Sequence, residues 1–380
     1  MVGETINASI ITTYPFPENM ATANRVNFFL NSLISLGIKE VNIICIQPND
    51  IKKFTFSKKI KVNLIYIGKK NKRNKSLIIK IIHEFFIILK TQRVLNNLNS
   101  DLYIYTIPSI LLIFNLLKKN NGIKLVDFRD IVWKYIENKS SIHRMLSFVI
   151  SLSVKHALKK VNYITVTNGI EKKFIESISN KKCTILKNGI EKEKFYEISC
   201  KSNFKEINFL NPTISYIGNI GLAQNLSTLI KFANINKNYN LRISGDGAEY
   251  KKILELSKNN KNIKMLGHIN WEDVVSEYII ADILYAQIKE DFYSALPTKP
   301  FEYLAAKRPI ILGLPEGIAK ETFSKFKNVY ICEPDNIKSL SLAFNRVLNF
   351  NNTDFLKNEE IISREFLRED NISKFINMFK

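Results

Sequence analysis

Two charged side chains in the second half of the chain have the spacing of a nucleotide-binding pair. Lys299 and Glu302 stand three residues apart in LPTKPFEYL, where a short helix is expected to begin, so they share a helix face. A lysine beside a helix N-terminus suits a diphosphate, and a carboxylate one turn later can accept hydrogen bonds from two ribose hydroxyls. The alternative is that Glu302 is an acid in the first helical turn that the helix dipole favours, and that Lys299 is solvated.

Glycines end three predicted strands of the same half. Gly218, Gly245 and Gly267 each follow a short apolar run, and Gly221 lies in the first of these corners. Glycine lets backbone N–H groups approach an anion closely, and the N-terminus of the next helix adds partial positive charge. Because ligands of open α/β sheets bind at the carboxyl ends of the strands, we expect these corners to line one site.

The elements that must position these residues alternate along the chain as strand and helix, which favours parallel sheets covered by helices. Strands are predicted at 7–12, 41–46, 62–67, 102–106, 123–127, 163–166 and 184–186, and then at 213–217, 241–244, 263–266, 283–286, 310–312 and 329–331. The polar stretch 191–211 separates the two series and is predicted to be a linker. The repetition predicts two doubly wound α/β domains.

The charge of the chain favours anionic partners. Lys and Arg number 56 against 35 Asp and Glu, a net charge of +21, which suits nucleic acid, anionic lipid or phosphorylated substrates. A uniform Lys-rich composition explains the same number equally well. No helix-turn-helix, zinc-finger or RNA-recognition pattern is present in the sequence, so we expect no specific nucleic-acid partner.

The cysteines and the start of the chain predict a reduced, cytoplasmic protein. The four cysteines are scattered and form no C-x-x-C pair, and no secretory pattern opens the chain. The first-half segment KLVDFRD offers only an isolated D-x-x-D corner, which is typical of solvated or structural acids. We therefore expect no metal site.

Two segments combine apolar stripes with basic residues. These are 141–160 (SIHRMLSFVISLSVKHALKK) and 72–93. Such helices can lie on an anionic membrane surface, which would place the protein on the inner face of the cytoplasmic membrane. Alternatively, their apolar faces pack on the first sheet.

The ordered motifs resemble those of a large enzyme family. The segment 281–309 (ADILYAQIKEDFYSALPTKPFEYLAAKRP) resembles the nucleotide-sugar segment of retaining glycosyltransferases with a GT-B fold, family 4 type. KNGIEKEKF, SYIGNIGLAQNL, SGDGAE and MLGHI resemble further motifs of that family in the same order. The likeness covers nearly the whole chain. Within the family it is nearest to the subgroup that builds bacterial surface polysaccharide, including N-acetylfucosamine transferases.

The resemblance implies a GT-B enzyme with two Rossmann-like doubly wound domains facing across a cleft. It places an acceptor-side domain at 1–200, a nucleotide-sugar-binding domain at 201–365, and a helix at 366–380 that packs back toward the first domain. The implied activity transfers a hexose, with retention, from a nucleoside-diphosphate donor, UDP-sugar favoured, to a glycan or lipid-linked acceptor. No cofactor is implied beyond this co-substrate, and metal independence is expected. The alternative is a non-catalytic homologue that binds a nucleotide or sugar.

The resemblance also assigns roles to residues of the second half. Glu302 matches the residue that holds the ribose, and Lys299 matches the lysine near the diphosphate. Gly267 and His268 match the corner whose backbone meets the base. The remaining donor-binding positions are Gly218, Asn219, Gly221 and Gly245.

In the first half, Asp130 and Arg129 match a corner near the donor sugar, and with Glu302 they are the predicted catalytic residues. Arg25 is predicted on the acceptor or phosphate side. The chain departs from the family at Ser294, where an acid would stand eight positions before Glu302. It also departs in the segment 219–224, where relatives carry an arginine and a lysine.

Overall fold

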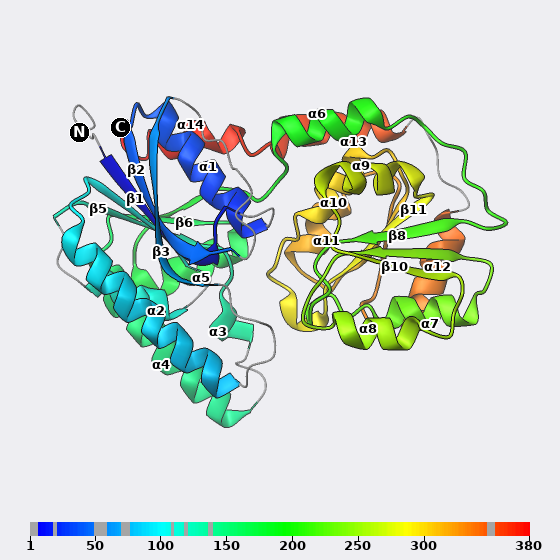
Figure 1. Cartoon of the computed structure of the whole chain (residues 1–380), viewed down its shortest axis with the longest axis horizontal. Coiled ribbons are helices and arrows are strands. Elements are labelled where there is room, and N and C mark those ends of the chain that lie inside the picture. Colours follow the sequence, from blue (N-terminus) through cyan, green and yellow to red (C-terminus); the bar gives the residue numbers. More distant parts are fainter. Residues whose placement is uncertain are drawn as a thin grey trace. The chain divides into compact units, whose positions relative to one another are not determined.

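The computed structural model describes residues 7–17, 21–48, 59–69, 77–107, 110–117, 121–135, 140–347 and 354–380. The chain forms two compact units, coloured along the sequence in Figure 1. Unit 1 comprises Met1–Lys187 and Glu369–Lys380, and unit 2 comprises Asn188–Arg368.

Unit 1 is built on a seven-stranded parallel sheet in the order β3-β2-β1-β4-β5-β6-β7. Its strands are β1 (Asn7–Pro15), β2 (Glu40–Gln47), β3 (Lys61–Lys69), β4 (Leu102–Ile107), β5 (Ile123–Phe128), β6 (Tyr163–Val166) and β7 (Cys183–Ile185). Its helices are α1 (Ala21–Ser35), α2 (Leu77–Asn97), the 3₁₀ helix η1 (Ile110–Leu117), α3 (Val132–Tyr135), α4 (Ser141–Leu158), α5 (Gly169–Ser179) and α14 (Asp370–Asn377).

Successive residues of the central strands of unit 1 enter two different cores. On β1, Ile10 packs in the core that includes α1 and α14, whereas Ile11 packs in the core that includes α2, η1 and α4. Side chains alternate between the faces of a strand, so a strand buried on both sides is apolar throughout. β4 follows the same rule with Ile104 and Tyr105.

Unit 2 has a six-stranded parallel sheet in the order β10-β9-β8-β11-β12-β13. Its strands are β8 (Thr213–Ile217), β9 (Asn240–Ser244), β10 (Ile263–Gly267), β11 (Ile283–Gln287), β12 (Ile310–Gly313) and β13 (Val329–Cys332). Its helices are α6 (Lys192–Lys201), α7 (Ser227–Ile235), α8 (Tyr250–Ser257), α9 (Trp271–Ile280), η2 (Glu290–Phe292), α10 (Lys299–Ala305), α11 (Ile318–Phe323), α12 (Ile337–Val347) and α13 (Asp354–Glu365).

Both sheets reverse their strand order at one point, as doubly wound sheets do. In unit 1 the reversal lies between β1 and β4, and in unit 2 it lies between β8 and β11. The carboxyl ends of strands at such a reversal leave room for a ligand. The predicted donor-binding corner after β8 therefore stands at the switch point of unit 2.

The division of the chain differs from the predicted boundaries at 200 and 365. α6 lies in unit 2, where Phe195 and Ile198 are buried in its core, so the predicted linker 191–211 begins with a helix. The apolar positions of α6 are few, and a polar stretch of this kind gives little helical signal without its packing partner. α14 lies in unit 1, where the ring of Phe375 contacts those of Phe28 and Phe29 on α1.

Candidate functional site

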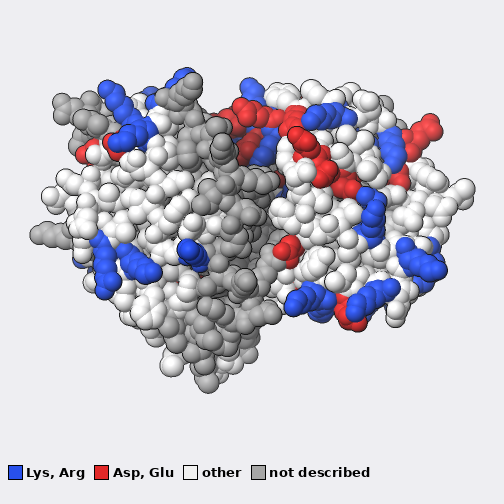
Figure 2. All heavy atoms as spheres, in the orientation of Figure 1, with Lys and Arg blue, Asp and Glu red and all other residues white. Residues whose placement is uncertain are grey.

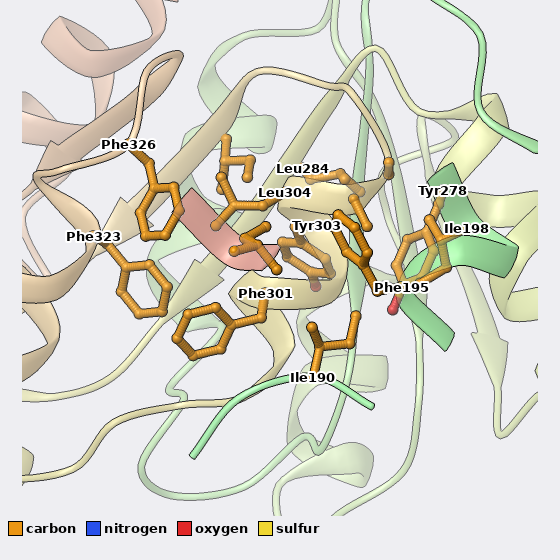
Figure 3. Close-up of a cluster of buried hydrophobic side chains, with 14 of the residues drawn as sticks. Ile190, Phe195, Ile198, Tyr278, Leu284, Phe301, Tyr303, Leu304, Phe323 and Phe326 are labelled. Atoms are coloured by element: carbon orange, nitrogen blue, oxygen red, sulfur yellow. The ribbon is translucent and has the colours of Figure 1, made fainter. Parts of the chain in front are cut away.

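Helix α10 is anchored on two sides in the core of unit 2. The ring of Phe301 lies 5.0 Å from that of Phe323. Figure 3 shows this pair of rings on one side of Tyr303 and the ring of Tyr278 on the other side. The hydroxyl of Tyr303 donates to the carbonyl of Ile217 and accepts from its N–H, both at 3.0 Å. These contacts fix α10 beside the carboxyl end of β8.

Lys299 and Glu302 form an ion pair on the first turn of α10. Nζ of Lys299 donates to Oε2 of Glu302 at 2.8 Å, and the hydroxyl of Tyr278 on α9 donates to the same oxygen at 2.7 Å. Nζ also donates to the Tyr278 hydroxyl at 3.2 Å. Glu302 is 9% exposed, and within the described ranges its Oε1 accepts no hydrogen bond. That oxygen can accept from a ligand hydroxyl.

The surroundings of Glu302 keep it ionised. Burial raises its pKa, but the charge of Lys299 and the hydrogen bonds from Lys299 and Tyr278 outweigh burial, so the pKa lies below the ordinary value. Burial and the neighbouring Glu302 raise the pKa of Tyr278 well above its ordinary value. At neutral pH the carboxylate therefore accepts hydrogen bonds and the phenol donates one.

The glycine corners form one hydrogen-bonded backbone surface. Gly218 donates to the carbonyl of Ser244 at 3.0 Å, and Gly245 donates to the carbonyl of Gly267 at 2.6 Å. Gly245 has φ +138°, and a Cβ there would lie 1.8 Å from the carbonyl oxygen of Gly218. A Cβ on Gly218 would lie 3.8 Å from Cγ of Lys299. The structure thus brings the predicted corners and α10 to one place.

The loop after β8 is held by neutral groups, at the place where the resemblance would have put two cations. Nδ2 of Asn219 donates to Oε1 of Gln224 at 3.2 Å, and the Tyr216 hydroxyl donates to the carbonyl of Asn219 at 2.6 Å. A Cβ on Gly221 would lie 2.5 Å from Nδ2 of Asn219, so this position needs a glycine while that pair is formed. Asn219 itself is exposed.

His268 is exposed, and its neighbour Gly267 has φ +68°. The left-handed conformation turns the backbone sharply at the end of β10. Among the described residues no partner fixes the imidazole, so the predicted contact of this corner with a base rests on its backbone.

The buried side chain of Gln287 centres a polar network behind the loop that the sequence pattern did not reveal. Nε2 of Gln287, at the end of β11, donates to the carbonyls of Gln224 and Asn225 and to Oδ1 of Asp335. The N–H of Asp335 donates to Oε1 of Gln287, and Oδ1 of Asp335 also accepts from Nδ2 of Asn225. Gln287 and Asp335 thus position the β8–α7 loop. A polar residue directly after the predicted strand 283–286 was the signal that could have revealed them.

Arg25 is engaged within unit 1. Its Nε and Nη2 donate to the two carboxylate oxygens of Asp127, and Nη1 donates to the carbonyl of Leu186 at 3.1 Å. Thr165 donates to the same carboxylate at 2.8 Å. Because each guanidinium nitrogen already has an acceptor, this geometry favours a structural role over the predicted contact with phosphate or acceptor.

Arg129 and Asp130 stand at the carboxyl end of β5, beside this ion pair. Burial and the nearby charge of Arg25 lower the pKa of Arg129, while Asp127, Asp130 and Tyr14 oppose that effect. Burial raises the pKa of the Tyr14 phenol. Cations and acids of unit 1 therefore lie close together at the carboxyl end of β5. The catalytic roles of Arg129 and Asp130 stay a prediction.

Glu171 is a second buried acid of unit 1 that the sequence analysis did not select. Its Oε2 accepts from the N–H and hydroxyl of Thr167 at 2.8 and 2.7 Å, and its Oε1 is buried with no hydrogen bond among the described residues. Burial raises its pKa to about 8, and Asp130 and Asp127 add to the effect. Glu171 therefore carries a proton at neutral pH.

Ser294 is buried, with 2% of its surface exposed, in the loop before α10. Glu290 and Asp291 belong to η2, and neither is buried. No group of three His, Cys, Asp or Glu side chains suited to a metal ion occurs among the residues that the structure describes.

Comparisons with known proteins bear on both units. Residues 201–362, which make up most of unit 2, match the family model of glycosyl transferases group 1. The chain also resembles sucrose-phosphate synthase from Thermosynechococcus elongatus at 15% identity, with a TM-score of 0.76 and 98% of each chain covered. The chain has the GT-B fold.

Two further GT-B structures cover both units. WaaG, a glycosyltransferase involved in lipopolysaccharide biosynthesis, is 13% identical, with a TM-score of 0.69 over 98% of this chain and 99% of that chain. HepE from Anabaena, solved with UDP and glucose, is 10% identical, with a TM-score of 0.64 over 98% and 99%. No curated protein matches the chain significantly.

Proposed function

We propose that the protein is a glycosyltransferase that moves a sugar, with retention, from a nucleoside-diphosphate donor to a glycan or lipid-linked acceptor. The observation that carries this proposal is the Lys299–Glu302–Tyr278 cluster beside the glycine corners of β8, β9 and β10. It lies in the part of the chain that matches the group 1 family model. UDP is the favoured nucleotide, and HepE, a structural relative, was solved with UDP.

The roles follow from the chemistry of each group. Oε1 of Glu302 accepts from a ribose hydroxyl while Oε2 keeps Lys299 and Tyr278 in place. The ammonium of Lys299 and the N–H groups of Asn219 and Gly221 stabilise the negative charge that develops on the departing diphosphate, because the N–H groups of Gly218 and Ile220 already donate to Ser244 and Asp246. Weakening of the bond from the sugar to the diphosphate gives an oxocarbenium-like carbon, and no protein nucleophile is required. Asp130 and Arg129 are the proposed catalytic residues of unit 1.

The pathway and conditions are also proposals. Synthesis of surface polysaccharide or a glycoconjugate in the cytoplasm would use such a donor, and WaaG acts in lipopolysaccharide biosynthesis. We propose that transfer is independent of metal ions. Activity that survives EDTA treatment would support this, and activity restored only by Mg²⁺ or Mn²⁺ would refute it.

Thermal stabilisation by UDP, GDP, ADP, CMP and dTDP tests the donor site. A ligand at 100 times its Kd stabilises a protein by about 2.7 kcal/mol, so a saturable rise in melting temperature is expected with one nucleotide. Glu302→Gln keeps an acceptor for Lys299 and Tyr278 but removes the charge, and it should reduce this rise. Glu316→Gln, at an exposed glutamate, is the matched control.

The outcomes separate the two functions considered. No stabilisation by any nucleotide would overturn the assignment of the donor site. Stabilisation without transfer or donor hydrolysis for any sugar nucleotide would identify a non-catalytic binding protein. Asp130→Asn should lower transfer and leave nucleotide stabilisation intact. The anomeric configuration of the product, read by proton NMR, tests retention.

A further inference from the structure

The exposed apolar side chains of unit 1 gather on three elements. α2 and α4 both pack against η1, and these elements carry eight large exposed apolar residues: Phe85, Phe86, Phe114, Met145, Leu146, Phe148, Val149 and Leu152. In unit 2, no helix has more than two such residues among those described. An apolar concentration of this kind marks an interaction surface.

Helix α4 is apolar on two opposite sides. Val154 and Leu158 are buried in the core of unit 1. Met145, Phe148, Val149 and Leu152 follow the spacing of a second stripe, and each is at least half exposed, up to 65% for Met145. Packing on the sheet, one of the two alternatives from the sequence, therefore explains only one of the two stripes.

Cations extend the exposed stripe. Lys155 and Lys159 follow Leu152 at three and seven residues, and Arg144 precedes Met145. All three cations are exposed, α4 contains no Asp or Glu, and no described carboxylate pairs with them. The whole of unit 1 has 32 Lys and Arg against 13 Asp and Glu, a net charge of +19.

We infer that this face of α4 docks on an anionic lipid bilayer. The α4 face is defined by Met145, Phe148, Val149 and Leu152 with the flanking cations Arg144, Lys155 and Lys159. An amphipathic helix of this kind lies in the interface, with apolar side chains among acyl chains and cations at the anionic head groups. None of the described helices has the length and apolarity to cross a bilayer.

Charge selects the bilayer over a second copy of the chain. A two-fold dimer through the α4 face would place the same cations of both copies against one another. An anionic membrane surface neutralises them instead, and each basic residue near such a surface contributes to binding. The inference does not depend on glycosyl transfer, because lipid binding is measured without a donor or an acceptor.

Flotation of the full chain with vesicles tests the apolar stripe. The wild-type protein should float with vesicles of phosphatidylcholine plus phosphatidylglycerol at low salt, and should not float with phosphatidylcholine alone. The apolar variant carries Met145→Gln, Phe148→Gln and Leu152→Gln. Its matched control carries Leu254→Gln, Leu256→Gln and Leu342→Gln, at exposed leucines of unit 2. Only the apolar variant should lose binding.

A second pair of variants tests the cations. The charge variant carries Arg144→Gln, Lys155→Gln and Lys159→Gln, and its control carries Lys251→Gln, Lys258→Gln and Lys261→Gln. Loss of one cation should weaken binding to anionic vesicles about fivefold, and loss of three should weaken it on the order of 100-fold. The control has the same net charge as the charge variant, so equal weakening in both would show that only total charge matters and would overturn the site.

Insertion of the α4 face into the bilayer can be measured by tryptophan fluorescence. In Phe148→Trp the tryptophan emission should shift to shorter wavelength when anionic vesicles are added, and brominated lipids should quench it. Absence of wild-type binding at low salt would overturn the inference. The inference would also be overturned if sedimentation at increasing protein concentration detected a dimer of the wild type that the apolar variant does not form. Circular dichroism of each variant checks that it is folded.

Discussion

The two units share a parallel α/β architecture, but nearly all of the net charge lies in unit 1. Unit 2 has 24 Lys and Arg against 22 Asp and Glu, compared with 32 against 13 in unit 1. Figure 2 shows cations and acids interspersed on the described surface of unit 2. Both kinds of charge contribute to this contrast, because unit 1 has eight more cations and nine fewer acids than unit 2. A uniform compositional bias therefore does not explain the charge of unit 1.

A second contrast concerns buried acids. Glu302 of unit 2 has a cation and a phenol as partners, and its pKa is lowered despite burial. Glu171 of unit 1 has only the donors of Thr167 among the described residues and lies near Asp127 and Asp130, and its pKa is raised to about 8. Similar burial thus gives opposite charge states, and the partner decides which one. The only two tryptophans, Trp133 in unit 1 and Trp271 in unit 2, allow each unit to be tested separately.

The largest effect is expected for Glu171→Gln at high pH. A carboxyl whose folded pKa is raised from 4.5 to about 8 loses stability as pH rises between these values. A pKa difference of one corresponds to about 1.4 kcal/mol, so the variant should be more stable than the wild type by on the order of 5 kcal/mol at pH 9 and nearly equal to it at pH 4. Urea unfolding followed by Trp133 measures this, and a pH-independent difference would contradict the raised pKa.

Arg25→Met should destabilise unit 1 by about 3–5 kcal/mol, because it leaves the buried carboxylate of Asp127 without its cation. The denaturation midpoint reported by Trp133, in a Trp271→Phe background, should fall. The midpoint reported by Trp271, in a Trp133→Phe background, should not move. Equal shifts of both signals would show that the units unfold together.

Gly245→Ala and Gly37→Ala separate backbone strain from crowding. Gly37 has φ +82°, and a Cβ there would have no atom within 4 Å, so alanine should cost unit 1 about 1–2 kcal/mol. Gly245 adds a clash with the carbonyl of Gly218, so its variant should cost unit 2 about 2–4 kcal/mol and weaken nucleotide stabilisation. Equal costs with unchanged nucleotide binding would contradict the close approach of β8 and β9.

Salt should produce the smallest effect. Self-repulsion destabilises a compact body of high net charge, and salt screens it. Raising sodium chloride should therefore stabilise unit 1 by about 1 kcal/mol and unit 2 by less. The two tryptophan signals measure both responses in one series, and a larger response of unit 2 would be inconsistent with the charge contrast.

The sequence predicted most of the fold and several of the residues that meet at the candidate donor site. Strand positions and both parallel sheets follow from short, continuous apolar runs, because a strand buried on both faces must be apolar throughout. Lys299 and Glu302 could be paired because three residues on a helix return to the same face. The glycine corners could be placed together because parallel strands end at one edge of the sheet.

The rest depended on contacts between residues far apart in the chain. The sequence could not show that Tyr278 completes the Lys299–Glu302 pair, that Asp127 engages Arg25, or that α6 belongs to unit 2. Nor could it show that one apolar stripe of α4 stays exposed, because a helical pattern does not state which of its faces is covered. Charge states, burial and domain membership are properties of the packed molecule, and only the tertiary structure decided them.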